Sequence, residues 1–217
     1  LPAAERLTSL CFARAEEHRW REQSAQRVAV PEPLIGGEET AQPVQPHAAS
    51  DLDRAYLALQ IADRRRFDAY RHPCIALADV PADLLRTLLL DVAAWRLAQV
   101  ATDKELAAAL GDAVRDATDR LAAANGIDVA ASLYHDRAAE QGGAAAAASS
   151  AIARHDWVAL IALASVASRR SYADMALALL GAETAALPIL LAPLKFNRTA
   201  LSPLEASIAR LPARAVT

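Results

Sequence analysis

The sequence contains few of the residues that build β-sheets, disulfide frameworks or metal sites. Its 217 residues include two cysteines, one methionine and seven glycines, and aromatic residues make up only 5%. Strands favour aromatic and β-branched side chains, and both are thinly spread along this chain. Alanine, leucine, arginine and the acidic residues are abundant instead, a composition that is typical of helices. We therefore predict an all-α fold.

The chain also lacks a strong charge of one sign and a long apolar run. Its formal net charge is −3, so no overall basic field would attract nucleic acid, and we expect no nucleic-acid partner. The longest apolar run covers residues 157–168. Because a membrane-spanning helix needs about 20 apolar residues, we interpret this run as a buried core helix and expect no membrane span.

The two cysteines, Cys11 and Cys74, are far apart and have no partners at metal-ligand spacing. We expect both to be buried thiols that pack as small hydrophobic residues. Unpaired cysteines suit a reducing compartment, and the chain does not begin with a charged and then apolar leader segment. These observations predict a cytoplasmic location.

Sequence motifs of the familiar enzyme classes are missing. The chain has no G-x-S-x-G nucleophile turn, no G-x-x-x-x-G-K phosphate loop and no G-x-G-x-x-G dinucleotide loop. Its five histidines include no pair at i, i+4 spacing, and no cysteine or acidic cluster completes a zinc-binding set. We therefore expect no metal, no cofactor and no enzyme of a familiar class. An enzyme with a novel site is a further hypothesis, which a deep polar pocket would support.

Proline and glycine separate an N-terminal helix from the rest of the chain. Residues 3–28 have the apolar spacing of an amphipathic helix and make up most of an N-terminal segment, residues 1–29. Residues 30–49 contain four prolines and a Gly-Gly pair, which predict a linker. This linker is long enough for the helix at 3–28 to reach a neighbouring molecule, so the pattern also predicts a swapped homodimer.

The body, residues 50–217, begins at the N-cap residue Ser50 and contains two candidate sub-domains, 50–125 and 127–211. We expect its first helices over residues 52–71, 82–101, 103–124 and 127–141. The first of them should end near His72, because the residue before a proline disfavours helix. Apolar spacing in the second helix predicts six inward-facing side chains: Leu84, Leu85, Leu88, Leu89, Val92 and Trp95.

The last quarter of the chain contains the same helical hairpin twice. When the segment that starts at residue 157 is shifted by 28 positions, Arg170 falls on Arg198 and Ser171 falls on Thr199. Each copy predicts an apolar helix, a short basic turn, a hydroxyl N-cap and a second helix. Repeats of this kind build helical-hairpin arrays. We expect hairpins stacked as an α-solenoid or as a compact orthogonal bundle.

Through the apolar spacing of residues 151–211, the chain resembles an uncharacterised bacterial family of HEAT-like helical repeat proteins. The resemblance implies a helical-repeat domain in this part of the chain. It brings no catalytic residues with it, and it does not extend to the N-terminal helix or the linker.

Arginines mark the surfaces that we expect to bind a partner. The guanidinium group is planar and always charged, so it suits carboxylate recognition. Two sets stand out, at the turns of the repeat and in the first helix of the body: Arg169, Arg170 and Arg198, and Arg64, Arg65 and Arg66. Because the chain also lacks catalytic motifs, we predict an intracellular protein–protein interaction or regulatory module without catalytic activity. Its arginines would bind an acidic surface on a partner protein. A solvated helix face is the simpler interpretation of the triplet.

His135 offers an alternative chemistry. It lies within a predicted helix and is followed by an acid and an arginine. An imidazole beside an acidic group can accept a phosphoryl group, so the alternative is a histidine phosphotransfer-type signalling protein that uses His135. A histidine beside a solvated ion pair on a helix surface is the simpler interpretation.

Overall fold

The computed structural model describes residues 2–28, 50–100, 103–122, 125–195 and 197–210, and within these ranges it contains helices and no strands. The all-α prediction is confirmed, while the predicted linker lies outside the described residues. The helices are α1 (Pro2–Val28), α2 (Asp51–Arg64), α3 (Ala82–Val100), α4 (Lys104–Ala122), α5 (Ile127–Glu140), α6 (Ala144–Ala153), α7 (Trp157–Ala167), α8 (Tyr172–Gly181), α9 (Leu187–Leu190) and α10 (Ser202–Ile208). Four 3-10 segments complete the described elements: η1 (Leu77–Asp79), η2 (Thr184–Ala186), η3 (Ala192–Leu194) and η4 (Arg198–Leu201).

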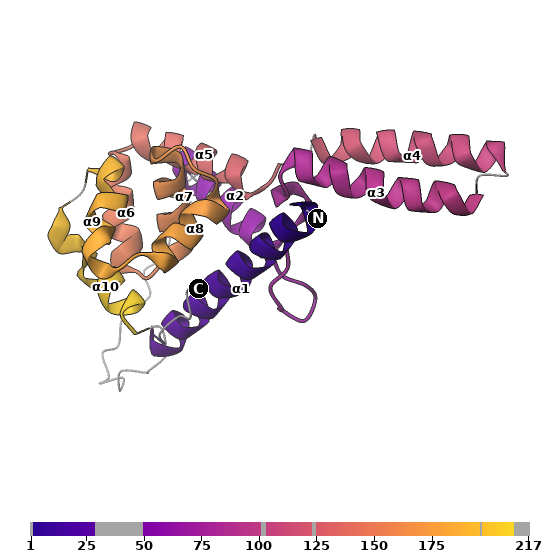
Figure 1. The fold of residues 1–217 in the computed structure, drawn as a ribbon. Helices are drawn as coiled ribbons and strands as arrows, with labels where there is room; N and C mark the ends of the chain where they lie inside the picture. Colours follow the sequence, from indigo (N-terminus) through magenta and orange to yellow (C-terminus); the bar gives the residue numbers. More distant parts are fainter. Residues whose placement is uncertain (1, 29–49, 101–102, 123–124, 196, 211–217) are drawn as a thin grey trace.

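Helix α7 forms the centre of the core, as its long apolar run predicts. Its residues from Trp157 to Ser165 are all buried, and α2, α5, α6 and α8 all pack against it (Figure 1). Alanines on α5 bring that helix close to α2 and α7. No described helix is long and apolar enough to cross a membrane.

Helix α1 packs on its own chain. It lies along α8 and touches the start of α3 (Figure 1). Its Trp20 side chain is fully buried and stacks on Trp157 of α7, with 5.1 Å between ring centroids. The Trp20 indole N–H donates to the Ser207 hydroxyl at 3.0 Å. The swapped homodimer through residues 3–28 stays a prediction.

Helices α3 and α4 form a hairpin that projects away from the other helices, and we call it the arm (Figure 1). Of the six side chains predicted to face inward on α3, Leu84 is buried and Leu85, Leu88 and Leu89 are half-buried, but the prediction is wrong for Val92 and Trp95. Val92 and Trp95 are 60% and 61% exposed. The physical reason is that α3 packs against α4 and the start of α1, and no further helix among the described residues covers its other sides.

The start of α2 agrees with the sequence prediction, whereas its end and the burial of the two cysteines do not. Ser50 caps α2 in a capping box with Asp53, as its position predicts. Helix α2, however, ends at Arg64 and not near His72, because the chain turns back there and Phe67 pairs with Pro73 in an isolated bridge. The expected burial of both cysteines is also wrong, since Cys11 is exposed and Cys74 is only half-buried.

The two sequence copies of the hairpin take different forms. The first copy is the pair α7 and α8, joined by a tight turn in which Arg169 has a φ of 53°. The second copy is divided among α9, η3, η4 and α10. Pro188 and Pro193 lie in this copy and lack the backbone N–H that a continuous helix needs.

Candidate functional site

Six charged side chains meet in a buried group that we call the ion cluster. Helix α1 supplies Arg14, Glu17 and Arg21, and η1 supplies Asp79. The last turn of α2 supplies Asp63, and the turn after α2 supplies Arg66. Glu17 is almost completely buried and accepts two hydrogen bonds from the Arg66 guanidinium, at 3.1 and 2.8 Å. Asp63 accepts two from Arg21, both at 2.7 Å. Three cations thus balance three carboxylates where water has little access.

The ion cluster keeps two of its carboxylates ionised. Burial acts to raise the pKa of Glu17, but the charges of Arg66, Arg14 and Arg21 outweigh it and hold the pKa below its ordinary value. Burial likewise opposes ionisation of Asp63, and its bond to Arg21 again leaves the pKa lowered. These directions follow because an opposite charge within a few ångströms favours the ionised form.

Asp79 connects the cluster to the end of the arm. Its Oδ1 accepts the backbone N–H of Ile127, the first residue of α5, at 2.7 Å. The residue before it, Gly126, has no space for a side chain, since a Cβ there would lie 2.5 Å from the Ala78 carbonyl oxygen. Burial raises the pKa of Asp79 despite this hydrogen bond.

Beside the ion cluster lies a groove of about 980 Å³, formed by α1, α2, the turn after α2 and the turn between α6 and α7. Its size is typical of ligand sites. The lining residues that concern us fall into three groups: the apolar Leu57, Ile61, Phe67 and Trp157, the basic Arg21, Arg64, Arg71 and Arg154, and the acidic Glu22, Asp63 and Asp156. His18 and His155 also line it.

The carboxylates of the groove already have partners. Arg21 holds Asp63, and the His18 ring lies 3.3 Å from a Glu22 oxygen. Asp156 accepts the Tyr56 hydroxyl at 2.6 Å and also caps α7 by accepting the N–H of Ala159. The acidic side chains of the groove are therefore engaged within the chain.

Three arginines of the groove have no such engagement. Arg64, Arg71 and Arg154 are exposed, and their side chains make no hydrogen bond or ion pair with any residue in the described part of the chain. They come from α2, the turn after α2 and the end of α6. Three separate segments thus direct uncompensated positive charge to one groove.

Two groove residues adopt a left-handed backbone that L-residues seldom take. Arg71 has a φ of 68° and His155 a φ of 56°. His155 follows the end of α6, where the N–H of Asp156 donates to Ala151 at 2.8 Å in a helix-ending turn that usually holds glycine. In this position, the His155 ring packs edge-on against Trp157.

The structure separates the arginine triplet expected to bind a partner. Arg64 lines the groove, Arg65 is exposed but does not line it, and Arg66 is buried in the ion cluster. Arg66 pairs with Glu17 and lies 4.8 Å from the centre of the Tyr172 ring. Its guanidinium is thus fully engaged within the chain.

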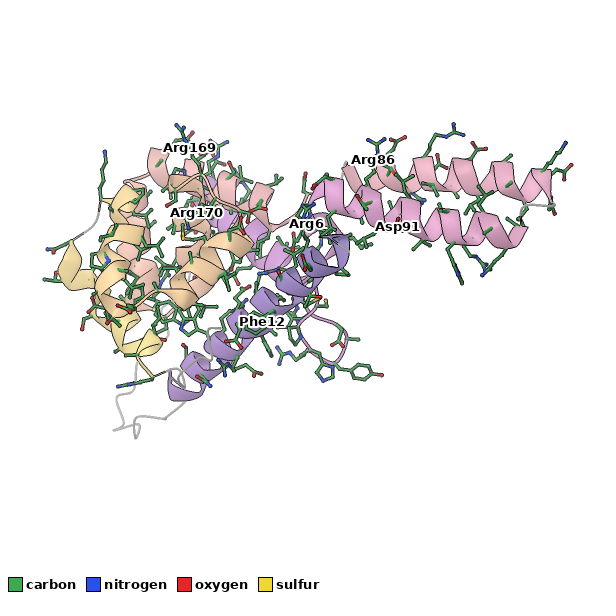
Figure 2. All side chains as sticks on the ribbon, viewed as in Figure 1. Arg6, Phe12, Arg86, Asp91, Arg169 and Arg170 are labelled. Atoms are coloured by element: carbon green, nitrogen blue, oxygen red, sulfur yellow. The ribbon has the colours of Figure 1, made fainter. Side chains whose placement is uncertain are left out.

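The other predicted site residues lie outside the groove. Arg169 and Arg170 are exposed at the turn between α7 and α8 (Figure 2). Arg198 belongs to η4, and its side chain lies outside the described residues. The His135 side chain on α5 is 21% exposed, with Nδ1 3.3 Å from an Asp136 oxygen. Its role as a phosphoacceptor stays a prediction.

Sequence reasoning missed Arg71, Arg154 and His155. Arg154 and His155 stand just before the apolar run of α7, where nothing in the sequence distinguishes them from other surface residues. The positive φ of Arg71 and of His155 leaves no mark on the sequence, because these residues are not glycines. Their convergence depends on how α2 packs against α7.

Comparison with protein-family models, with curated proteins and with solved structures gives no significant match to this chain. Within the described ranges, no group of three or more histidine, cysteine or acidic side chains could hold a metal ion. A function must therefore be argued from the groove and its charges.

Replacing Glu17 with glutamine should lower the free energy of unfolding by about 3 kcal/mol, because three guanidinium groups then lose a shared buried carboxylate. Urea denaturation at pH 7 measures this change. Glu22→Gln removes an exposed carboxylate from the same helix and should change the free energy by less than about 0.5 kcal/mol. Equal effects of the two substitutions would contradict the role of the cluster.

Acid should destabilise the protein through the same two carboxylates. The folded-state pKa values of Glu17 and Asp63 lie below their ordinary values. Their contribution is therefore complete above the unfolded-state pKa of about 4 and is lost as the pH falls from there through the lower folded-state values. Asp79, with its raised pKa, acts in the opposite direction. Urea midpoints measured between pH 7 and pH 3 should fall less steeply for Glu17→Gln than for the unmodified protein.

Replacing His155 with glycine should raise the free energy of unfolding by up to about 1 kcal/mol, because glycine adopts a positive φ without steric cost. Ala153→Gly provides the matched control, since it places glycine inside α6 and should destabilise by about 1 kcal/mol. Urea denaturation measures both. Loss of stability in His155→Gly would show that the contact with Trp157 outweighs the backbone strain.

Proposed function

We propose that this chain is a protein-binding module whose groove holds an acidic, amphipathic segment of a partner protein. The observation that carries the proposal is the convergence of Arg64, Arg71 and Arg154 on one groove without anionic partners in the described chain. Arginine forks bind carboxylates with two parallel hydrogen bonds. A segment rich in Asp and Glu supplies such groups at close spacing.

The apolar wall of the groove supports a segment that is amphipathic as well as acidic. Leu57 and Ile61 are both exposed and lie one helical turn apart on α2. Phe67 and Trp157 extend this apolar surface. A partner helix with apolar residues at i, i+3 and i+4 can cover such a wall while its acidic residues reach the arginines.

The groove residues support binding over catalysis. Ser24 is buried and donates its hydroxyl to the Trp20 carbonyl at 3.0 Å, so it is not available as a nucleophile. The Tyr56 pKa is raised by burial and by the hydrogen bond to Asp156, which keeps the phenol protonated. This proposal keeps the expected acidic partner protein and moves the site from the repeat turns to the groove. The proposal also retains three expectations from the sequence: a regulatory role, a HEAT-like helical repeat and an intracellular location.

A designed peptide tests the proposal. A fluorescein-labelled peptide of 16 residues, with leucines at i, i+3 and i+4 and glutamates elsewhere, should bind the full chain, and its fluorescence anisotropy should rise. Arg64→Glu should weaken this binding about tenfold, equal to 1.4 kcal/mol. Arg65→Glu makes the same change of charge at the neighbouring exposed residue, outside the groove, and should leave the affinity unchanged.

Two further peptides separate the contribution of charge to binding from that of apolar contact. A peptide with lysine in place of glutamate should not bind, and one with alanine in place of leucine should bind more weakly. Affinity for the first peptide should fall as salt is added, because exposed charges are screened. If Arg64→Glu and Arg65→Glu weaken binding equally, the groove is not the site. If Arg170→Glu weakens binding instead, the peptide binds at the turn between α7 and α8.

A further inference from the structure

The arm exposes an unusual amount of apolar surface. Leu90, Val92, Trp95 and Leu97 on α3 and Leu106 on α4 are each at least 44% exposed. Helix α3 has one buried residue among its 19, and α4 has none among the side chains that the structure describes. Among the described elements outside the arm, α1 packs against α3 and η1 packs against α4.

This surface is costly for a structure that consists of two helices. A helix that is apolar on most of its sides is normally buried on most of its sides, and only six of the 19 residues of α3 are polar: Asp83, Arg86, Thr87, Asp91, Arg96 and Gln99. Its single seam with α4 leaves the other apolar sides in water. Most helix stability in proteins comes from packing of the apolar face. A further element must therefore cover the arm.

One face of the arm combines apolar side chains from both helices. The seam between α3 and α4 is formed by half-buried residues that include Leu89 and Ala93 on α3 and Leu110 and Val114 on α4. The residues directly before half-buried seam positions form two stripes: Leu88 and Val92 on α3, and Leu106, Ala109 and Ala113 on α4. Trp95, three residues after Val92, continues the stripe on α3. One residue back is a rotation of about 100° in each helix. Because the helices are antiparallel, this rotation places both stripes on the same side of the hairpin, which we call the arm face.

We propose that the arm face binds the arm face of a second copy of this chain, with the two arms antiparallel in a four-helix bundle. The arm, residues 82–122, has five basic and seven acidic side chains, a net charge of −2. Two such arms do not repel each other strongly, and they offer little attraction to nucleic acid or to an anionic membrane. An antiparallel arrangement also keeps the two bodies at opposite ends of the bundle.

The charges at the edge of the face match in this arrangement. Ala113 is the middle residue of α4, with Glu105 eight residues before it and Arg120 seven residues after it. In a two-fold pair with antiparallel arms, Glu105 of one copy is level with Arg120 of the other. The symmetry forms this ion pair twice.

The arm face has the area that a stable dimer needs. Each helix has 19 residues, which gives a length of about 28 Å, and two helices side by side are about 20 Å wide. The accessible surface of a face of this size approaches the roughly 800 Å² per partner that stable interfaces bury. Coverage of Val92 and Trp95 by the same residues of a second copy supplies the apolar centre.

Light scattering of the full chain after size-exclusion chromatography tests the proposal. We expect a mass of twice the 23.0 kDa of one chain. The double substitution Val92→Glu and Trp95→Glu should give the mass of one chain, because it buries four like charges at the centre of the bundle. The matched control is Ile189→Glu, which changes an apolar residue that is 79% exposed outside the arm and should leave the dimer intact. A dimer that persists in the double variant overturns the proposal. So does a single-chain mass for the unmodified protein at a concentration of about 100 μM, which is about 100 times the Kd of a weak, micromolar dimer.

A cysteine cross-link tests the arrangement without depending on a destabilised variant. The background is a chain in which both native cysteines are replaced, Cys11→Ser and Cys74→Ser. In this background, Val92→Cys places a thiol next to the proposed two-fold axis. Two copies should then form a disulfide with each other under mild oxidation. Leu90→Cys lies about 160° around α3 from Val92, on the opposite side of the helix, and should not. Disulfide formation requires Cα atoms within about 7 Å, so a dimer in which Val92→Cys stays reduced overturns the arm-to-arm geometry. Helical circular dichroism confirms that each variant is folded.

Discussion

Glu17 carries a negative charge at a position almost without access to water, and this charge determines how the N-terminal half of the molecule is assembled. A carboxylate can remain ionised there only while cations surround it. Arg14, Arg21 and Arg66 provide them, with Arg66 reaching Glu17 from beyond the end of α2. Through Asp63 and Asp79 the same cluster holds α1, the turn after α2 and the start of α5 in one arrangement.

An ionic contact at this position gives α1 a definite register, where an apolar contact of similar stability would not. Apolar faces tolerate small sliding and rotation, and replacement of buried ion pairs by apolar residues is often neutral for stability. The two parallel hydrogen bonds between Arg21 and Asp63 accept only one rotation of α1. That rotation places His18 and Glu22 on the wall of the groove. The shape of the candidate site therefore follows from the cluster beside it.

The pattern of the sequence predicts which residues share a helix face, but not what covers the face. The long apolar run correctly predicts that α7 is buried, and Ser50 correctly marks the start of α2. Apolar spacing on α3 places Val92 and Trp95 inward, whereas both are more than half exposed in the described part of the chain. The triplet of Arg64, Arg65 and Arg66 shows the same limit. Its three members are alike in sequence, and the position at which α2 ends decides that one lines the groove, one faces solvent and one is buried.

The position of the ion cluster also bears on whether the groove and the arm affect each other. Helix α1 forms part of the groove wall and also touches the start of α3, so it is a direct physical connection between them. For α1 to move, the buried ion pairs of Glu17 and Asp63 must separate, and loss of one partner in such a pair costs about 3–5 kcal/mol. Allosteric coupling energies are typically about 1–3 kcal/mol. A ligand that binds the groove in its present shape gains nothing from displacing α1, so α1 acts as a fixed wall for it. Binding in the groove and association through the arm then proceed independently, each set by its own surface.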